Sequence, residues 1–431
     1  MRVLLLDLDL TLVNTSDCQA YMRSSAGRQA VLEEIASGRI GLPVYDTRLP
    51  AYINVLAETP NLAVAIVSDS PAEYCAHVLR QAGYNIDNRL IFGSQSKPIT
   101  NILNLRTQIS ALFAFANIEF LVVGDSPKDI YMAHALGVPS ILAAWGSRHD
   151  IDVVTRWSRP TVVARTFEEL QSHITNFLNG HMPHTAYAFD SDYHTIDINV
   201  VDRIHVPPEN IGHGQEYVPD RTQYRNNTDR YASLDLRSIV KRAKDLPISH
   251  HNAKRGVPSF GVNGLYQTAP LMSKAGHYKR SFVEWCRSRN IQGKILLVPV
   301  PSSVPRECNL TYTMDLICDW WKLWINGNEA GLNIEVCSSF ERFWPRSPSH
   351  LTGGRRDMDD HFDTLGIFKG TDSIDDVNHV VIVDDVVTSG SHIDAMATFI
   401  RAVGLVPATA VIHGYALYRT VHPEAVDLGD F

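Results

Sequence analysis

The sequence predicts an α/β protein of two domains, each built on a parallel sheet, and three observations predict this fold class. The chain has 431 residues, which is too long for one ordinary core of about 100 to 200 residues. Short apolar runs alternate with amphipathic stretches, which is typical of βα units. Several runs end in Asp, Ser or Gly-Asp, which places polar groups at the carboxyl ends of strands, where open α/β sheets build their sites.

The elements fall into two series separated by an irregular segment. In residues 1–178 we expect strands at VLLLDLD, LAVAIVSDS and FLVVGDSP, and helices at QAVLEEIASG, PAEYCAHVLRQAGY and DIYMAHALGV. Residues 179–235 are rich in Asn, Asp, His, Tyr and Pro, and we interpret them as a linker with short strands. In residues 236–431 strands are expected at KILLVPVP, VVIVDDVV and TAVIHGYAL, with helices between them. The two series share no motif spacing, so they are not repeats.

Composition narrows the class of protein. An apolar fraction of 45% and a charged fraction of 20% are close to globular averages. The net charge of −8 does not indicate the basic surface that binds nucleic acid. Nucleic acid is therefore unsupported as a partner but not excluded. Six scattered cysteines indicate free thiols in a reducing compartment. No signal peptide or membrane span of about 18 apolar residues is recognisable, so we expect a cytoplasmic protein. The sequence does not indicate its oligomeric state.

Two carboxylates stand at the end of the first strand. Asp7 and Asp9 are separated by one residue, so their side chains face the same way. Neighbouring carboxylates repel each other unless a cation intervenes, and Mg²⁺ bound by carboxylate oxygens meets this need. Asp125 and Asp129 in GDSPKD are the natural completing groups. The sequence therefore predicts a Mg²⁺ site made of all four aspartates.

Two further side chains complete this first constellation. Ser68, at the end of LAVAIVS, offers a hydroxyl to a phosphoryl oxygen, and Lys97 in SQSKP offers a positive charge. Each residue alone has a simpler explanation, because Asp and Ser at strand ends are usually helix caps or turn formers. The four groups occur in order at intervals of about 60, 30 and 30 residues, and this combination favours a phosphate-handling site.

These residues resemble the four motifs of the haloacid dehalogenase (HAD) superfamily, and the resemblance covers residues 1–178. It implies a Rossmannoid parallel sheet and a Mg²⁺-dependent phosphatase. Asp7 would attack phosphorus to give an aspartyl phosphate, Asp9 would protonate the leaving oxygen and later activate water, and Asp125 would hold Mg²⁺ with Asp7. Between the motifs there is room only for a minimal cap, which implies either a large substrate or cover from another domain.

A second constellation lies near the C-terminus, in HVVIVDDVVTSGSHIDA. Two carboxylates close a β-branched strand, and a hydroxyl-rich turn leads into a helix. Backbone N–H groups at such a helix start bind a phosphate monoester, and the carboxylates can accept hydrogen bonds from a sugar diol. A phosphate beside a diol describes ribose 5-phosphate. The candidate residues are Asp384, Asp385, Thr388, Ser389, Gly390 and Ser391.

This segment resembles the 5-phosphoribosyl 1-pyrophosphate (PRPP) motif of type I phosphoribosyltransferases, and residues 265–419 are similar to the ComF-like branch. The resemblance implies a phosphoribosyltransferase fold, a turn after KILLVP that binds pyrophosphate, and an arginine on a loop that closes over it. His392 departs from the pattern, because the family usually has a threonine there. The further residues that the resemblance assigns to PRPP are Pro301, Ser302, Lys274, Arg355 and Arg356.

Three hypotheses of function follow. The first is a bifunctional enzyme of nucleotide metabolism, in which one domain joins PRPP to a base, or handles a ribonucleotide, and the other hydrolyses a phosphomonoester. The second is a phosphatase controlled by a non-catalytic domain that senses PRPP or a nucleotide. The third, suggested by the minimal cap, is a phosphatase for polynucleotide ends, which the acidic net charge disfavours.

Overall fold

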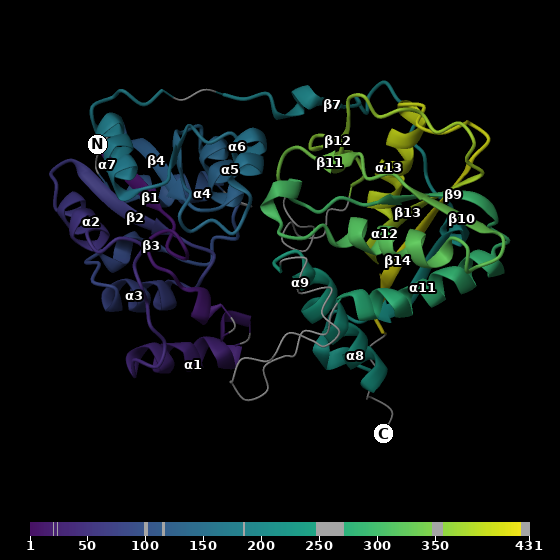
Figure 1. Cartoon of the computed structure of the whole chain (residues 1–431), viewed down its shortest axis with the longest axis horizontal. Coiled ribbons are helices and arrows are strands. Elements are labelled where there is room, and N and C mark those ends of the chain that lie inside the picture. Colours follow the sequence, from purple (N-terminus) through teal and green to yellow (C-terminus); the bar gives the residue numbers. More distant parts are fainter. Residues whose placement is uncertain are drawn as a thin grey trace, which may run out of the picture. The chain divides into compact units, whose positions relative to one another are not determined.

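The computed structural model describes residues 1–19, 21–23, 25–98, 102–113, 117–183, 186–246, 271–346 and 357–423. They form two compact units, one ending at Ala188 and the other beginning at Phe189 (Figure 1). Both units are mixed α/β structures with a parallel sheet. All six cysteines are free and buried. None of the described helices is long and apolar enough to cross a membrane.

The first unit is built on a six-stranded sheet in which every neighbouring pair is parallel. Its strand order is β3-β2-β1-β4-β5-β6. The chain therefore moves outward from β1 in one direction and then restarts at β4 in the other. Ligands bind at such a reversal point in open α/β sheets. The strands are β1 (Arg2–Leu6), β2 (Leu62–Val67), β3 (Ile91–Phe92), β4 (Glu119–Gly124), β5 (Ser140–Ala143) and β6 (Val162–Ala164).

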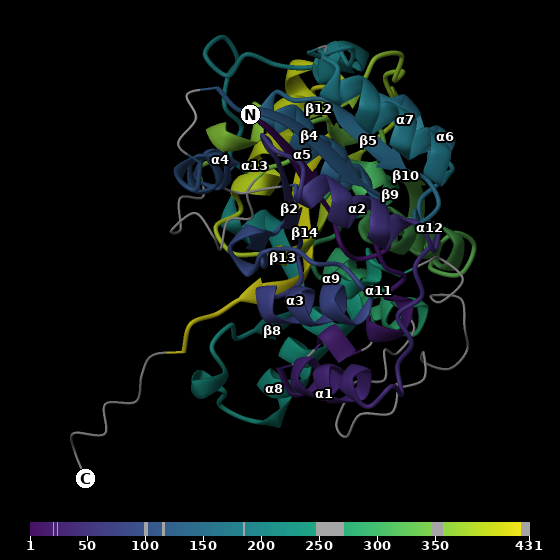
Figure 2. The same ribbon diagram turned by 90° about the vertical axis from the view of Figure 1, so that its left-hand side faces the viewer.

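Helices cover both faces of this sheet (Figures 1 and 2). Leu4 and Leu6 of β1 pack with helices α1, α2, α3 and α7, whereas Val3 and Leu5 pack with α4 and α5. Because alternate residues of a strand face opposite sides, a strand buried on both faces is a continuous apolar run. The helices are α1 (Ser25–Ala36), α2 (Leu49–Ala57), α3 (Ala72–Gln81), α4 (Ile102–Ala111), α5 (Pro127–Leu136), α6 (Ile151–Ser158) and α7 (Phe167–Leu178).

The second unit contains a five-stranded parallel sheet of order β10-β9-β13-β14-β8 and a small antiparallel sheet of order β11-β12-β7. The chain runs from β9 to β10 on one side and from β13 to β14 on the other, so the reversal lies between β9 and β13. The strands are β7 (Tyr193–His194), β8 (Ile211–Tyr217), β9 (Gly293–Pro299), β10 (Leu332–Val336), β11 (Phe340–Arg342), β12 (Leu365–Phe368), β13 (His379–Val387) and β14 (Val411–Thr420).

Two apolar layers enclose the second sheet. Helices α8, α11 and α12 pack on one face, and α13 with strands β11 and β12 packs on the other. Trp321 of α12 is fully buried, stacks on Phe282 and donates from its indole N–H to the carbonyl of Ala275 at 3.0 Å, so it is a core residue. The helices are α8 (Asn227–Asp235), α9 (Lys241–Ala243), α11 (Leu271–Ser288), α12 (Thr313–Ile325) and α13 (Ser391–Ala402).

The segment that we interpreted as a linker contributes β8, an edge strand of the main sheet paired with β14. Its sequence IGHGQEY hides this role because two of its residues are glycine. A Cβ atom on Gly212 would lie 2.4 Å from the Trp285 ring, and one on Gly214 would lie 3.0 Å from the carbonyl oxygen of Leu417. The two glycines therefore leave space for the Trp285 ring and the Leu417 carbonyl group. They also interrupt the alternation of apolar and polar residues that normally indicates a strand.

Candidate functional site

The four motifs of the first unit converge at the carboxyl edge of its sheet. Asp7 follows β1, Ser68 follows β2, Lys97 lies in the loop after β3, and Asp125 follows β4. Asp129 lies in the first turn of α5. Neighbouring parallel strands deliver their loops to the same edge, so residues separated by up to 122 positions in the sequence meet at the reversal between β1 and β4.

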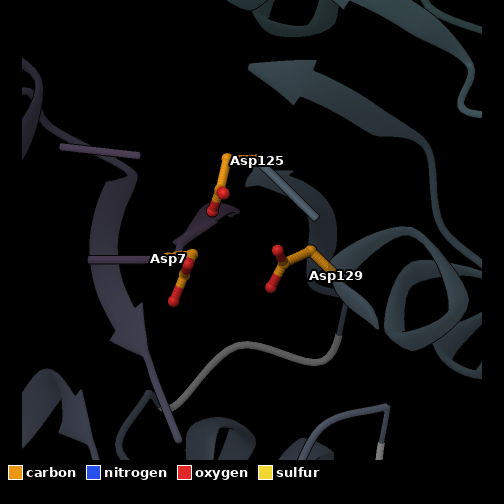
Figure 3. A group of neighbouring side chains, drawn as sticks. All are labelled: Asp7, Asp125 and Asp129. Carbon is orange, nitrogen blue, oxygen red and sulfur yellow. The ribbon is translucent and has the colours of Figure 1, made fainter. Parts of the chain in front are cut away.

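Three of the four aspartates form a compact, buried group (Figure 3). One oxygen of each carboxylate of Asp7, Asp125 and Asp129 lies within 4.8 Å of the others. Asp7 is 6% exposed, Asp125 5% and Asp129 0%. Carboxylate oxygens are the ligands that Mg²⁺ prefers, usually one or two of them together with waters and substrate phosphate. The number, type and spacing of the donors thus fit a divalent cation of this kind.

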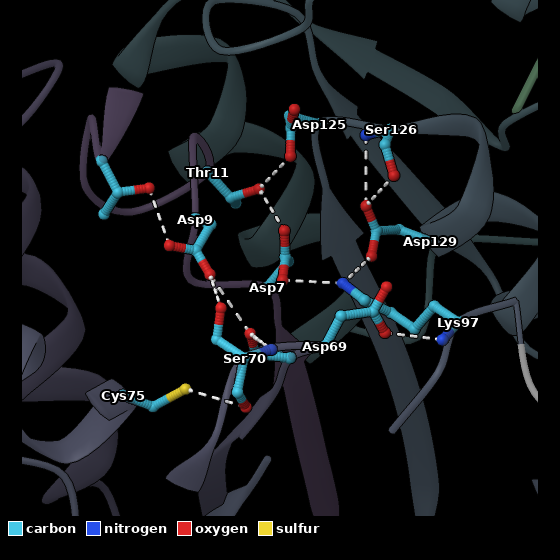
Figure 4. A network of polar contacts seen from close by, with 12 residues as sticks. Asp7, Asp9, Thr11, Asp69, Ser70, Cys75, Lys97, Asp125, Ser126 and Asp129 are labelled. Carbon is cyan, nitrogen blue, oxygen red and sulfur yellow. Dashed lines mark hydrogen bonds and ion pairs between the residues drawn. The ribbon is translucent and has the colours of Figure 1, made fainter. Parts of the chain in front are cut away.

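Lys97 is the cation of this cluster (Figure 4). Its ammonium group donates to Asp7 Oδ1 at 2.7 Å and to Asp129 Oδ1 at 2.5 Å. The backbone N–H of Lys97 donates to Asp69 Oδ1 at 2.6 Å, which fixes the loop from which the side chain extends. When all three carboxylates are ionised, their charge and that of the one ammonium group sum to −2. One divalent cation would neutralise this charge.

The ionisation of the cluster reflects its burial. Burial raises the pKa of Asp7 well above its ordinary value, and Lys97 only partly opposes this rise. Burial also raises the pKa of Asp125 to about 7, and Asp129 adds to the effect. For Lys97, burial favours the neutral amine, but Asp129 and Asp7 outweigh it and raise the pKa of the ammonium group. Lys97 therefore stays charged, whereas burial favours the protonated forms of Asp7 and Asp125 unless a further cation joins the cluster.

Two hydroxyl residues hold the cluster together. Thr11 donates to Asp125 Oδ1 at 3.1 Å and lies 3.4 Å from Asp7 Oδ2. Ser126 contacts Asp129 twice, from its backbone N–H at 3.1 Å and from its hydroxyl at 2.8 Å, and forms the capping box of α5. Our reading of the sequence did not assign a role to either residue. The capping pattern Ser-x-x-Asp in GDSPKD was the available signal for Ser126.

Gly124 makes the close approach of β4 and α5 possible. A Cβ atom at this position would lie 2.2 Å from Cγ of Asp129, a separation at which one of the groups must move. The glycine before Asp125 is thus required for Asp129 to reach the carboxylate group of the site.

Asp9 lies apart from the other carboxylates and faces a set of hydroxyl groups (Figure 4). Its Oδ1 accepts from Thr15 at 2.7 Å and Tyr74 at 3.1 Å. Its Oδ2 accepts from Ser70 at 2.7 Å and Ser68 at 3.3 Å. Asp9 is thus held by hydroxyl groups and is not one of the three aspartates whose oxygens lie within 4.8 Å of one another; its expected role as a Mg²⁺ ligand stays a prediction. Ser68, expected to meet phosphate directly, is within reach of Asp9.

A second polar site lies at the carboxyl edge of the second sheet. Asp384 and Asp385 stand near the end of β13, and the backbone N–H of Asp385 donates to Asp384 Oδ1 at 2.7 Å. Lys241 of α9, which we had not singled out, lies 2.5 Å from Asp385 Oδ2. Gly390 caps α13 with φ of 85°, a conformation that favours glycine. Thr388 and Ser389 are exposed and Ser391 is half-buried, and the hydroxyl groups of Ser389 and Ser391 are 3.2 Å apart.

The expected pyrophosphate turn lies at the same edge. Pro301 and Ser302 follow β9, which pairs directly with β13, so this turn and the turn at 388–391 flank the reversal of the sheet. Lys274, in contrast, pairs with Asp235 at 2.5 Å, and among the described residues no hydrogen bond or ion pair joins it to this edge. Arg355 and Arg356 lie outside the described residues.

Comparison with known proteins finds resemblance only among solved structures. No family model and no curated protein matches the sequence. A hydrolase from Pseudomonas syringae is 16% identical, with 41% of this chain and 99% of that chain covered and a TM-score of 0.31. A predicted phosphatase from Clostridium acetobutylicum is 15% identical, with 41% and 98% covered and a TM-score of 0.30. A haloacid dehalogenase-like hydrolase from Streptococcus pneumoniae is 13% identical, with 40% and 97% covered and a TM-score of 0.27.

Proposed function

We propose that the first unit is a Mg²⁺-dependent phosphohydrolase in which Asp7 is the nucleophile. The observation that carries this proposal is the buried cluster of Asp7, Asp125 and Asp129 around the single cation Lys97, whose net charge is −2 when all three carboxylates are ionised. A phosphate monoester is the kind of substrate that brings oxygens to a metal and a lysine at once. When bound, Mg²⁺ would neutralise charge on the phosphoryl oxygens.

In the proposed reaction Asp7 and Asp9 have different roles. Asp7 would attack phosphorus while the bond to the leaving oxygen breaks, and Asp9 would give that oxygen a proton. Water would then attack the aspartyl phosphate, Asp9 would take up its proton, and phosphate would leave. The contacts of the two carboxylates differ: Asp7 meets Lys97, whereas Asp9 accepts from four hydroxyl groups, which favour its ionised form and so fit the step in which it takes up a proton from water.

Metal removal tests this part of the proposal. Hydrolysis of p-nitrophenyl phosphate in excess Mg²⁺ is expected to fall to the buffer rate after EDTA and to return when Mg²⁺ is restored, because the carboxylates alone repel an anionic substrate. Far-UV circular dichroism before and after chelation controls for unfolding. Hydrolysis at an unchanged rate in EDTA would contradict the metal requirement.

For the second unit we propose a PRPP site at the carboxyl edge of its sheet. The turn at 388–391 offers backbone N–H groups and hydroxyls at the start of the 12-residue helix α13 to the 5′-phosphate. Asp384 and Asp385 offer acceptors to the ribose diol, and the turn of Pro301 and Ser302 lies across the reversal of the sheet. Together with the first unit, this supports an enzyme that joins PRPP to a base and hydrolyses a ribose-linked phosphomonoester.

Replacing the paired carboxylates tests the second site. The double variant Asp384→Asn and Asp385→Asn is expected to weaken PRPP binding, measured calorimetrically with Mg²⁺, by roughly tenfold or more, because charge-assisted acceptors are lost. Asp376→Asn, an exposed aspartate of the same unit, is the matched control and should bind PRPP like the wild type. If wild-type protein binds no PRPP, the proposal for this unit fails, while that for the first unit stands.

Turnover separates two roles for the second unit. PRPP consumption with release of pyrophosphate, in the presence of a panel of bases, is the result expected of a transferase. If PRPP instead binds without being consumed and changes the rate of phosphomonoester hydrolysis, the second unit is a sensor that controls the first. Each result leaves the assignment of Asp7 as the nucleophile unchanged.

A further inference from the structure

Arg342, the last residue of β11, is buried, and within the described residues its guanidinium meets only carbonyl, hydroxyl and imidazole groups, while its backbone N–H donates to Glu341 Oε1 at 3.1 Å. Arg342 is 1% exposed. Its Nε donates to the carbonyl of Ser302 at 3.3 Å, and its Nη1 donates to Thr364 Oγ1 at 2.5 Å and to the carbonyl of His361 at 3.3 Å. Its Nη2 lies 3.3 Å from His361 Nδ1 and 2.9 Å from His392 Nε2. Arg346 Nη1 also lies 3.0 Å from His361 Nδ1 and 2.8 Å from its Nε2, so the two arginines share the one acceptor of the neutral His361 ring.

The contact with Arg342 decides the proton position on His392. A guanidinium has donors but no acceptors, so Nε2 of His392 must accept and carries no hydrogen. Burial lowers the pKa of His392, which favours the neutral ring. A neutral imidazole without hydrogen on Nε2 carries its hydrogen on Nδ1. His392 is therefore fixed as an Nδ1–H donor.

That donor faces the first aspartate of the proposed PRPP site. Nδ1 of His392 lies 3.7 Å from Oδ2 of Asp384, which is longer than a hydrogen bond, while Oδ1 already accepts from the backbone N–H of Asp385. Contacts of this kind are often long in a free site and shorten in the complex. His392 also stacks on His361, with ring centroids 4.2 Å apart, so one face of its ring is packed and the orientation of the ring plane is restricted.

We propose that Arg342 and His392 are positioning residues that tie the turn at Ser302 to the carboxylate of Asp384. This inference rests on the proposed PRPP site of the second unit. Arg342 holds the Ser302 carbonyl on one side and the His392 ring on the other, and His392 directs its Nδ1–H to Asp384. These contacts fix the distance between the turn of Pro301 and Ser302 and the turn at 388–391. His392 supplies a donor at the position where the resemblance led us to expect a hydroxyl.

A purely structural role for His392 makes a different prediction from a positioning role. If the ring only fills space, any side chain of similar volume should serve. If the polarity of the ring matters, the substitute needs one acceptor for Arg342 and one donor for Asp384. Glutamine offers both, through its carbonyl oxygen and its amide N–H, whereas methionine has a similar length and no N–H donor.

The test compares His392→Gln with His392→Met in the full chain. Calorimetric titration with PRPP and Mg²⁺ is expected to give a Kd for His392→Gln within about threefold of the wild type, and a Kd for His392→Met raised roughly tenfold. Thermal unfolding and hydrolysis of p-nitrophenyl phosphate by the first unit check that both variants are folded. Arg342→Lys is the second variant, expected to raise Kd similarly, and its effect should not add to that of His392→Met.

The outcomes separate the inference from the proposal on which it rests. Equal PRPP affinity of His392→Met and wild type would overturn the positioning role but leave the PRPP site intact. Equal weakening by Gln and Met would also overturn it, because polarity would then be irrelevant. Additive effects of Arg342→Lys and His392→Met would show that the two residues act separately. Absence of PRPP binding by wild-type protein would overturn both the site and the inference.

Discussion

Replacing Asp7 by asparagine is expected to reduce phosphomonoester hydrolysis at least about a thousandfold, because the substitution removes the nucleophile. The amide keeps the size of the side chain and can still meet Thr11, so substrate binding should suffer less than turnover. The loss is therefore expected in kcat. Single-turnover measurement of phosphate release, with p-nitrophenyl phosphate in excess Mg²⁺, separates the two parameters. An Asp7→Asn variant with wild-type kcat would disprove the proposed chemistry.

The same variant should be folded, and its stability gives an independent check. Asp7 is buried beside Asp125 and Asp129, so removing its charge relieves repulsion while Lys97 keeps its contact with Asp129. In EDTA the variant is expected to unfold at the same or a higher temperature than the wild type. Asp87→Asn is the matched control, because Asp87 caps a short helix on the surface of the same unit and asparagine caps equally well. It should change neither activity nor stability.

Replacing Lys97 by methionine is expected to impair both activity and stability. Methionine keeps the length of the side chain but leaves Asp7 and Asp129 without their buried cation. Breaking a buried ion pair by removing one partner costs about 3 to 5 kcal/mol. We therefore expect a lower denaturation midpoint in EDTA, partial recovery of stability when Mg²⁺ is added, and little recovery of activity, since the phosphoryl group also loses a cation.

Lys128→Met is the control for this loss. Lys128 lies in α5, next to Asp129, and no ion pair with it is found among the described residues. Removing its charge should leave the denaturation midpoint and the hydrolysis rate close to wild type. If Lys97→Met proved as stable and active as Lys128→Met, the ammonium group would have no part in balancing the carboxylates, and the charge argument for the metal site would fail.

The sequence predicted the outline of the first site because its chemistry lies in short motifs at strand ends. Asp7, Lys97, Asp125 and Asp129 meet because parallel strands share one edge, which follows from the βα alternation alone. The separate setting of Asp9 could not be predicted. Its four hydroxyl partners come from three segments, and the direction in which its side chain turns depends on where those segments pack.

The second unit shows the same limit more strongly. The run VVIVDD and its turn predicted β13 and the start of α13, since both signals are local. The acceptors of Arg342 come from residues 302, 361, 364 and 392, which no spacing rule connects. Likewise, β8 is recognisable only from its partners, because the residues that fill the space above its glycines belong to α11 and β14.

The cation site that we propose at the Asp7 cluster has a consequence for the protein in solutions of different ionic composition. A cation that binds the folded unit and not the unfolded chain stabilises it by RT ln(1 + [L]/Kd), about 2.7 kcal/mol at a hundredfold excess over Kd. The resistance of the first unit to heat and to proteases should therefore rise with the logarithm of free Mg²⁺. At low free Mg²⁺ we therefore expect this unit to be less stable as well as less active.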